Sequence, residues 1–480
     1  MTRVLRVLRL EGLRAYVRSR PGAKRVPAVL VVCLYIAMLL CIPSVLIFRP
    51  LGAPGTPANM LGMVALAWWV CATLGGQNPI RGLTPTRVGA ALMAVAILIP
   101  YANGTATGWF APPAVRSGID NWTLLAPTVD EINAMVAKAA DRGLLSVVGW
   151  LGIMLLAAEG MRSWRDIDTV VNWVSWLAAF MAGLGIIQFF TGLDIAGLFQ
   201  IPGLSANSDF GAVASRSVLN RVASTAAHPI EYGVVLAALF PLALHRTIFR
   251  WGERYALLPT FLIGLGMFLS VSRGAVVAVL CAFLVLLIGW PARWKLRALA
   301  ILPFAVVGLR VAVPGLVGTL LSFFVNADKD PSVEGRTQDY AAVHLLWGEH
   351  PWFGRGLFTL MPQYYRILDN EYLLLLVELG AIGLSMFLIA LLIGYFCARG
   401  THHHAADERS RNVGLSISAG LFGLLVAHAT FDGLGFPMAA GVTFLLTGLG
   451  GATWRLTRLG VPPEPELERQ SRTPVLEGAA

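Results

Sequence analysis

Residues 369–383 read Asp-Asn-Glu-Tyr-Leu-Leu-Leu-Leu-Val-Glu-Leu-Gly-Ala-Ile-Gly. This stretch places an acid and an amide where a polar, arginine-rich loop at 319–371 meets a long apolar segment. Ionisable groups beside lipid are costly, and they are kept mainly where they serve a function. The stretch therefore predicts a membrane-spanning helix and, at its first residues, a place for chemistry.

The composition of the whole chain agrees with a membrane protein. Of its 480 residues, 56% are hydrophobic and only 13% are charged, whereas about 25% of the residues of a soluble domain are charged. We expect an all-α, polytopic membrane protein. The net charge of +10 does not indicate nucleic acid as a partner, because the basic residues are spread over short loops.

The long apolar runs of the sequence predict how many helices cross the membrane. A span needs about 20 apolar residues. The sequence predicts about twelve transmembrane helices, at 26–48, 60–76, 88–102, 143–158, 170–190, 230–249, 255–270, 275–290, 298–318, 372–396, 415–431 and 438–454.

The distribution of basic residues predicts the orientation. With the N-terminus inside, 25 of the 37 Lys and Arg residues fall on the inner side, and the outer ones lie mostly in long loops. Short loops rich in Lys and Arg stay in the cytoplasm. Both termini are therefore expected to be cytoplasmic.

The domain organisation follows from these assignments. Residues 1–25 predict a basic amphipathic segment on the inner membrane surface, with a solvated start as the alternative. Residues 26–454 form the transmembrane domain, and the charged, proline-containing residues 455–480 a disordered cytoplasmic tail. In the large extracytoplasmic loop, an amphipathic helix is expected at 337–349, with apolar residues on one face: Tyr340, Val343, Leu346 and Trp347.

The expected outer face gathers many cationic side chains and few acidic ones. They are Arg216, Arg221, His228, Arg273, Arg336, His344, Arg355 and Arg366, with Asp369 beside them. Arg273 lies between two apolar runs, so a partner is expected for it. Guanidinium groups bind phosphate in a planar, two-pronged way, which suits a lipid-linked diphosphate. The alternative is that these arginines only anchor helix ends.

Four segments resemble the O-antigen ligase/polymerase family of bacterial membrane glycosyltransferases. They are Asn220–Thr225 continuing to Gly233, Ser272–Ala275, Gly335-Arg336 with Glu349–Gly356, and Asp369-Asn370 followed by Gly380 and Gly383. The four occur in the family's order, each at an expected outer boundary. The similarity covers residues 200–400, and the rest of the chain agrees only in consisting of membrane helices.

The resemblance implies a fold, a reaction and a place. Members of the family are metal-independent, many-helix glycosyltransferases of the bacterial plasma (inner) membrane. They move a glycan from a polyprenyl-pyrophosphate carrier to an acceptor on the outer side. Ligases use a lipid-linked core sugar as acceptor, and polymerases use another lipid-linked repeat unit. The expected partners are therefore this donor, a lipid or glycan acceptor and membrane lipids.

The resemblance also implies residue roles. Arg221 and Arg273 would hold the pyrophosphate, and Asp369 would be the base or would orient the acceptor. Six further residues would bind substrate: Arg336, Asn370, His228, His344, Arg355 and Arg216. Asn370 could instead cap the helix, and His228 could be structural. No metal is expected, and His428, Phe431 and Asp432 are a further candidate sugar contact.

Asp369 departs from the ligase pattern, which has His-Asn where this chain has Asp369-Asn370. In ligases that histidine is regarded as the base. An aspartate could do the same work if burial raised its pKa. The difference favours a polymerase or a non-standard ligase.

Two other classes of protein fit the twelve spans. One is a transporter of a glycan or lipid-linked sugar, although no internal repeat is visible and the polar residues cluster outside rather than at the midplane. The other is an envelope assembly component without catalysis. Neighbouring genes for glycosyltransferases and a flippase would favour the polymerase.

Overall fold

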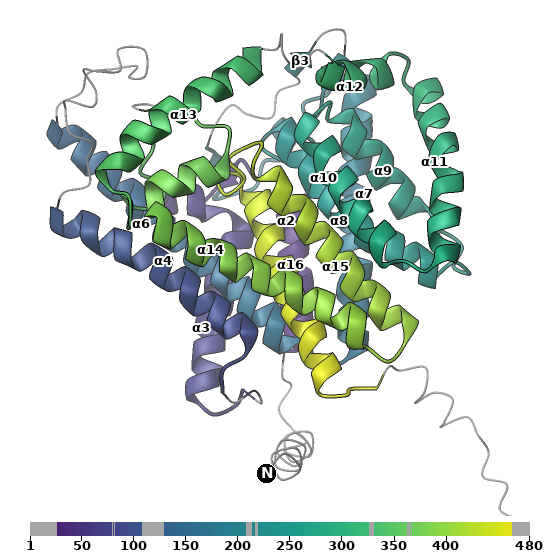
Figure 1. Ribbon diagram of the computed structural model, residues 1–480, viewed down its shortest axis with the longest axis horizontal. Coiled ribbons are helices and arrows are strands. Elements are labelled where there is room, and N and C mark those ends of the chain that lie inside the picture. The colour runs from purple at the N-terminus through teal and green to yellow at the C-terminus, as the bar shows by residue number, and fades with distance from the viewer. Residues whose placement is uncertain are drawn as a thin grey trace, which may run out of the picture.

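The computed structural model describes residues 26–78, 80, 82–107, 129–207, 214–216, 219–325, 331–361, 365 and 367–462. Within these residues the regular secondary structure is almost entirely helical (Figure 1). The helices are α2 (Ala28–Cys41), α3 (Pro57–Leu74), α4 (Pro85–Thr107), α6 (Val129–Gly160), α7 (Trp164–Thr191), α8 (Pro229–Phe249), α9 (Leu258–Leu269), α10 (Arg273–Gly289), α11 (Ala292–Ala312), α12 (Leu316–Val325), α13 (Pro331–Glu349), α14 (Glu371–His404), α15 (Glu408–Ala427) and α16 (Pro437–Arg458).

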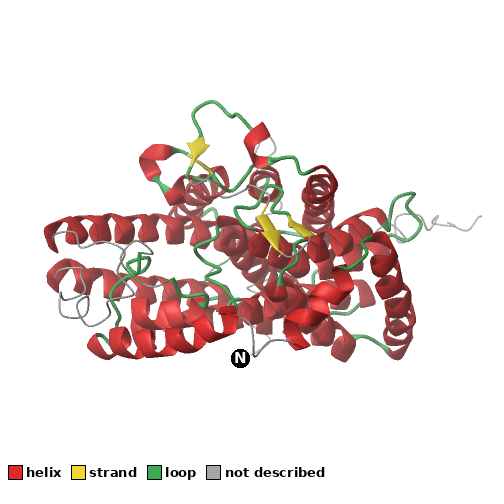
Figure 2. Cartoon of the chain, turned by 90° about the horizontal axis from the view of Figure 1, so that it is seen from above, coloured by secondary structure: helices red, strands yellow, loops and turns green. Residues whose placement is uncertain are grey.

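The described strands are short and form two antiparallel pairs. They are β1 (Leu46–Ile47) with β2 (Ser205–Ala206), and β3 (Ala214–Arg216) with β4 (Leu219–Arg221). Three 3-10 turns, η1 (Arg49–Leu51), η2 (Ala53–Gly55) and η3 (Ala196–Leu198), complete the described elements. Seen from above (Figure 2), the strands lie among loops over the helix ends. The all-helical class is therefore confirmed.

Polar side chains set where several helices begin. Thr56, Ser163, Ser272, Asn370 and Asp407 each accept a backbone N–H in the first turn of the helix that follows. A cap of this kind stabilises a helix by about 1 kcal/mol. The apolar runs thus begin at defined residues.

Seven helices are long and apolar enough to cross a membrane: α3, α4, α6, α7, α8, α14 and α15. The helices α2, α9 and α10 are apolar but shorter. Each of the twelve predicted spans overlaps a described helix. Membrane-like helices are thus confirmed, and the number twelve stays a prediction.

Burial separates the centre of the bundle from its edge. Helix α16 is buried from Met438 to Ala452 with almost no interruption, and α8 is buried to a similar extent. In contrast, α11 at the edge exposes large apolar side chains such as Phe304 and Val307. An exposed apolar face of this kind matches lipid.

The connections gather at two opposite ends, as alternating spans require. At the first end, Ser44 N–H donates to Thr225 O at 2.8 Å and Glu371 N–H to His428 O at 2.9 Å. We call it the Asp369 end. At the opposite end, Arg409 pairs with Asp168 at 2.7 Å.

The chain remains folded beyond the predicted start of its tail. Helix α16 continues to Arg458, and Trp164 Nε1 donates to Val461 O at 2.9 Å. The predicted boundary at residue 455 therefore lies too early. Residues 1–25, with the predicted amphipathic segment, and residues 463–480 are outside the described part of the chain.

The predicted helix of the large loop is present and longer than expected. It is α13, which begins at Pro331 instead of residue 337. Val343 and Leu346 are buried in a cluster with Val377 of α14. Tyr340 is 60% exposed, so it does not share that contact.

Helix α14 is interrupted at Gly380, which has φ 70° and ψ 178°. The loop 351–356 supplies the missing backbone partners. Arg355 and Gly356 N–H donate to Glu378 O at 2.9 and 2.7 Å, and Ala381 N–H donates to Pro351 O at 2.8 Å. The helix after Gly380 is roughly 36 Å long at about 1.5 Å per residue, enough to cross a bilayer alone. The predicted span 372–396 therefore consists of two helices.

We expect Gly380→Ala to lower the free energy of unfolding by roughly 2–6 kcal/mol, since backbone strain and overpacking each cost about 1–3 kcal/mol. A Cβ there would lie 2.4 Å from the backbone carbon of Trp352, at a positive φ. Thermal unfolding in detergent would measure the effect. Gly308→Ala is the control, because a Cβ at Gly308 of α11 meets nothing within 4 Å. Equal melting temperatures for the two variants would contradict this account.

Candidate active site

Four helices begin close together at the Asp369 end: α8, α10, α14 and α16. Glu231 of α8 accepts N–H bonds from Met438 and Ala439 of α16, at 2.6 and 3.3 Å. A Cβ at Gly274 of α10 would lie 2.7 Å from Thr430 Oγ1. The residues 428–436 between α15 and α16, here the α15–α16 loop, thus connect these helix starts. Helix N-termini carry partial positive charge and favour anions.

Arg221 ends β4 and enters the bundle beside α9. Its Nε donates to Ser270 O at 3.5 Å, and its side chain is half-buried. The next residues are structural. Ser224, at φ 53°, donates its hydroxyl to Met181 O at 2.8 Å, and Thr225 donates to Leu40 O at 2.7 Å. Within the segment Asn220–Thr225, Arg221 is therefore the candidate for a role in the reaction.

Arg273 is the first residue of α10, directly after a tight reversal of the chain. Val271 has φ 48°, and Ser272 caps α10 by accepting Ala275 N–H at 3.4 Å. A cation at a helix N-terminus is unfavourable by about 0.3–1 kcal/mol. The stability of α10 therefore does not account for an arginine at this position.

The residues Asp369, Asn370 and Glu371 have three different environments. Asn370 is the cap of α14, and its Oδ1 accepts Tyr372 N–H at 3.0 Å. Glu371 is fully buried and accepts Leu434 N–H at 2.8 Å. Asp369 is exposed. Of the two roles open to Asn370, capping is the one that the structure describes.

Asp432 lies in the α15–α16 loop, next to the start of α14. Glu371 N–H donates to the carbonyl of Phe431, the residue before Asp432, at 3.2 Å. Burial, and after it the charges of Asp369 and Glu231, raise the pKa of Asp432 to about 7. A carboxylate that titrates near neutral pH beside Asp369 is suited to proton transfer. The sequence offered this residue only as a sugar contact.

His228 is the cap of α8. Its Nδ1 accepts Ile230 N–H at 3.2 Å. Burial, and then the charge of Arg221, lower the pKa of His228 to about 4. The imidazole is therefore neutral at physiological pH, with one nitrogen already used in the cap.

For the remaining predicted residues, the described part of the chain shows no contact with the cluster of helix starts. Arg355 is buried and pairs with Glu349, which gives it a structural use. His344 is exposed on α13. Arg216 lies in β3 and Arg336 in α13, and their side chains are outside the described part of the structure, as is Arg366.

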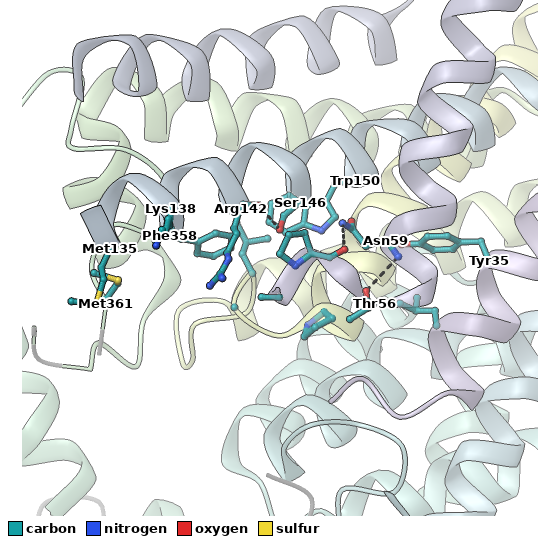
Figure 3. Close-up of a pocket in the computed structure, with 17 residues that line it drawn as sticks. Tyr35, Thr56, Asn59, Met135, Lys138, Arg142, Ser146, Trp150, Phe358 and Met361 are labelled. Carbon is teal, nitrogen blue, oxygen red and sulfur yellow. Dashed lines mark hydrogen bonds between the residues drawn. The ribbon is translucent and has the colours of Figure 1, made fainter. Parts of the chain in front are cut away.

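A cavity of about 490 Å³ lies beside the α15–α16 loop (Figure 3). Its wall includes residues of α2, α3 and α6, together with Phe358, Met361 and the loop residues Leu434 and Gly435. Arg221, Arg273 and Asp369 are not among the residues that line it. Sequence reasoning did not foresee this cavity.

The fold and these helix starts define a polytopic helical membrane protein with cationic and acidic groups at one end of its bundle. Residues 258–388 match the family model described as O-Antigen ligase. This match confirms the predicted resemblance to the O-antigen ligase/polymerase family. No curated protein matches the chain.

The match covers about a quarter of the chain, from α9 into α14. It contains Arg273, α13, the Gly380 break and Asp369. Arg221 and the motif around it lie before the matched region. Together with the apolar helices, the match supports a membrane glycan ligase or polymerase of a bacterium.

Proposed function

We propose that this protein transfers a glycan from a polyprenyl-diphosphate carrier to an acceptor hydroxyl on the outer face of the plasma membrane. One observation carries the proposal. The segments that bear Arg221 and Arg273 meet at Ser270, at a cluster of helix N-termini that also holds Asp369 and Asp432. Arginines bind the leaving diphosphate, and carboxylates activate the attacking alcohol.

In the proposed reaction, the acceptor oxygen attacks the anomeric carbon of the donor glycan. The bond between that carbon and the diphosphate oxygen breaks, and both bonding electrons leave with the diphosphate. Arg221 and Arg273 stabilise the charge on the leaving group, so that no metal is needed. The proton of the acceptor hydroxyl passes to the pair of Asp369 and Asp432, with Asp369 in contact with the acceptor.

The orientation of the site follows from charge. With the Asp369 end outside, most basic residues of the chain, 25 of 37, fall on the cytoplasmic side. The ion pairs of Arg293 and Arg409 then lie inside. Both chain ends would be cytoplasmic.

The acceptor decides between ligase and polymerase. Asp369 stands where ligases of the family carry histidine, which favours a polymerase or a non-standard ligase. Purified protein given a labelled lipid-linked repeat unit would distinguish them, because a polymerase lengthens the glycan without another acceptor. No transfer in the presence of either lipid-linked repeat units or a lipid core acceptor would contradict the proposed function.

The rate of transfer is expected to rise with pH through about 7, where Asp432 loses its proton. Below this pH the protonated carboxyl cannot accept a further proton. Asp432→Asn should flatten this limb and lower the rate at pH 8 by about tenfold, less than loss of the contacting base. The measurement is the initial rate between pH 5.5 and 8.5, with Asp194→Asn as control. An unchanged limb in Asp432→Asn would show that Asp432 takes no part.

A further inference from the structure

The cavity beside the α15–α16 loop has a cationic part and an aromatic part. Figure 3 shows Lys138 and Arg142 on the same stretch of α6, with Met135 and Met361 beyond Lys138. Trp150 lies further along α6, toward Tyr35 of α2. The volume of about 490 Å³ falls within the range of ligand pockets.

Among the residues that the structure describes, the charged side chains that line the cavity are both cationic. Lys138 and Arg142 line it, and no described Asp or Glu does. In the described part of the chain, no ion pair joins either side chain to a carboxylate. Like charges four residues apart on a helix repel each other. Lys138 and Arg142 are both exposed and lie four residues apart on α6, an arrangement that suits an anionic ligand.

The rest of the wall is suited to sugar rings. Trp150 is fixed by stacking on Phe444, with ring centroids 5.1 Å apart, and by an edge contact to Phe358 at 6.2 Å. Phe358 has φ 62°, a strained conformation for a non-glycine residue. Strain of this kind clusters at ligand-binding sites. Aromatic side chains combine a flat apolar face with a rigid position, which fits the C–H faces of a saccharide.

The cavity and the proposed active site adjoin the same loop. Leu434 lines the cavity, and its backbone N–H donates to Glu371, two residues after Asp369. Asp369 itself does not line the cavity, so a glycan chain that meets Asp369 at one end would have to pass the α15–α16 loop to enter it.

We propose that this cavity binds an acidic saccharide segment of the substrate, with Lys138 and Arg142 on its carboxylates and Phe358, which Trp150 holds in place, against a sugar ring. The inference rests on the proposed function and adds the chemical class of the glycan. An anionic lipid headgroup offers similar charge, and the experiment below includes it as a separate probe.

Equilibrium binding of fluorescein-labelled trigalacturonic acid to the full chain in detergent tests the inference. Wild-type protein should bind it, and salt should weaken the binding. The double variant Lys138→Ala/Arg142→Ala should bind at least tenfold more weakly, and Ala139→Phe, which fills the cavity without a change of charge, should also weaken binding. Arg165→Ala, at the opposite end, is the control. Maltotriose should compete poorly because it is neutral.

Several outcomes would overturn the inference: equal binding by the double variant, equal binding of maltotriose, or displacement of the probe by phosphatidylglycerol alone. The readout is separate from catalysis, so Arg273→Ala should bind the probe normally. If the double variant binds normally while Arg273→Ala loses transfer, the cavity inference fails and the proposed function stands. If Arg273→Ala transfers glycan normally, the proposed function fails.

Discussion

Replacement of Arg273 by alanine is expected to reduce glycan transfer by about 10²–10³-fold, the usual loss when one group that stabilises a developing negative charge is removed. Arg273 begins α10 after the reversal at Val271, so its charge adds to that of the helix N-terminus. The loss should appear in kcat, because the charge on the diphosphate grows as the glycosidic bond breaks.

Initial rates with a lipid-linked glycan in nanodiscs would measure the effect of Arg273→Ala. Arg273→Lys should recover part of the rate, because lysine restores the charge but not the two-pronged contact. The control is Arg165→Ala, an exposed arginine at the opposite end. If Arg273→Ala is folded and as fast as the control, the arginine does not serve the reaction.

Removal of Asp369 should have the second large effect. Asp369→Ala is expected to lower transfer by about 10²–10⁴-fold, the usual contribution of a general base. The fold should persist, because Asp369 is exposed and Asn370 supplies the cap of α14. The loss should therefore not be accompanied by a lower melting temperature.

The variant Asp369→His tests whether Asp369 acts as a base or only supplies a negative charge. Histidine occupies this position in ligases of the family, so it should restore much of the rate lost in Asp369→Ala. Asp194→Ala, an exposed acid in another loop of the same end, is the matched control. A histidine variant as slow as Asp369→Ala, or an alanine variant of normal rate, would refute the assignment of Asp369 as base.

The membrane-like helices could be predicted because each is a run of apolar residues between polar or proline-containing breaks. The Gly380 break could not, since the apolar pattern continues through Leu379 and Ala381. That break depends on backbone partners from the loop 351–356, which come from elsewhere in the chain. A hydropathy pattern predicts which residues avoid water. It does not predict the hydrogen-bond partners of their backbone groups.

The arginines of the proposed site stand out in the sequence, because a charge such as Arg273 between apolar residues is conspicuous. Asp432 does not, because one aspartate after an apolar run is ordinary, and only the fold buries it beside Asp369. For the same reason Lys138 and Arg142 resembled ordinary solvated charges. Only the structure shows that they line one cavity together with Trp150, which lies further along the same helix.

The most direct test of the central claim is binding of undecaprenyl diphosphate to the purified protein, measured by native mass spectrometry in a neutral detergent. The wild type should bind the diphosphate far more tightly than undecaprenol, and Arg221→Ala/Arg273→Ala should weaken this binding by about 100-fold or more, since hydrogen bonds to charged groups contribute about 1.5–3 kcal/mol each. Equal affinity of the wild type and the double variant would contradict the claim that these two arginines hold the leaving group.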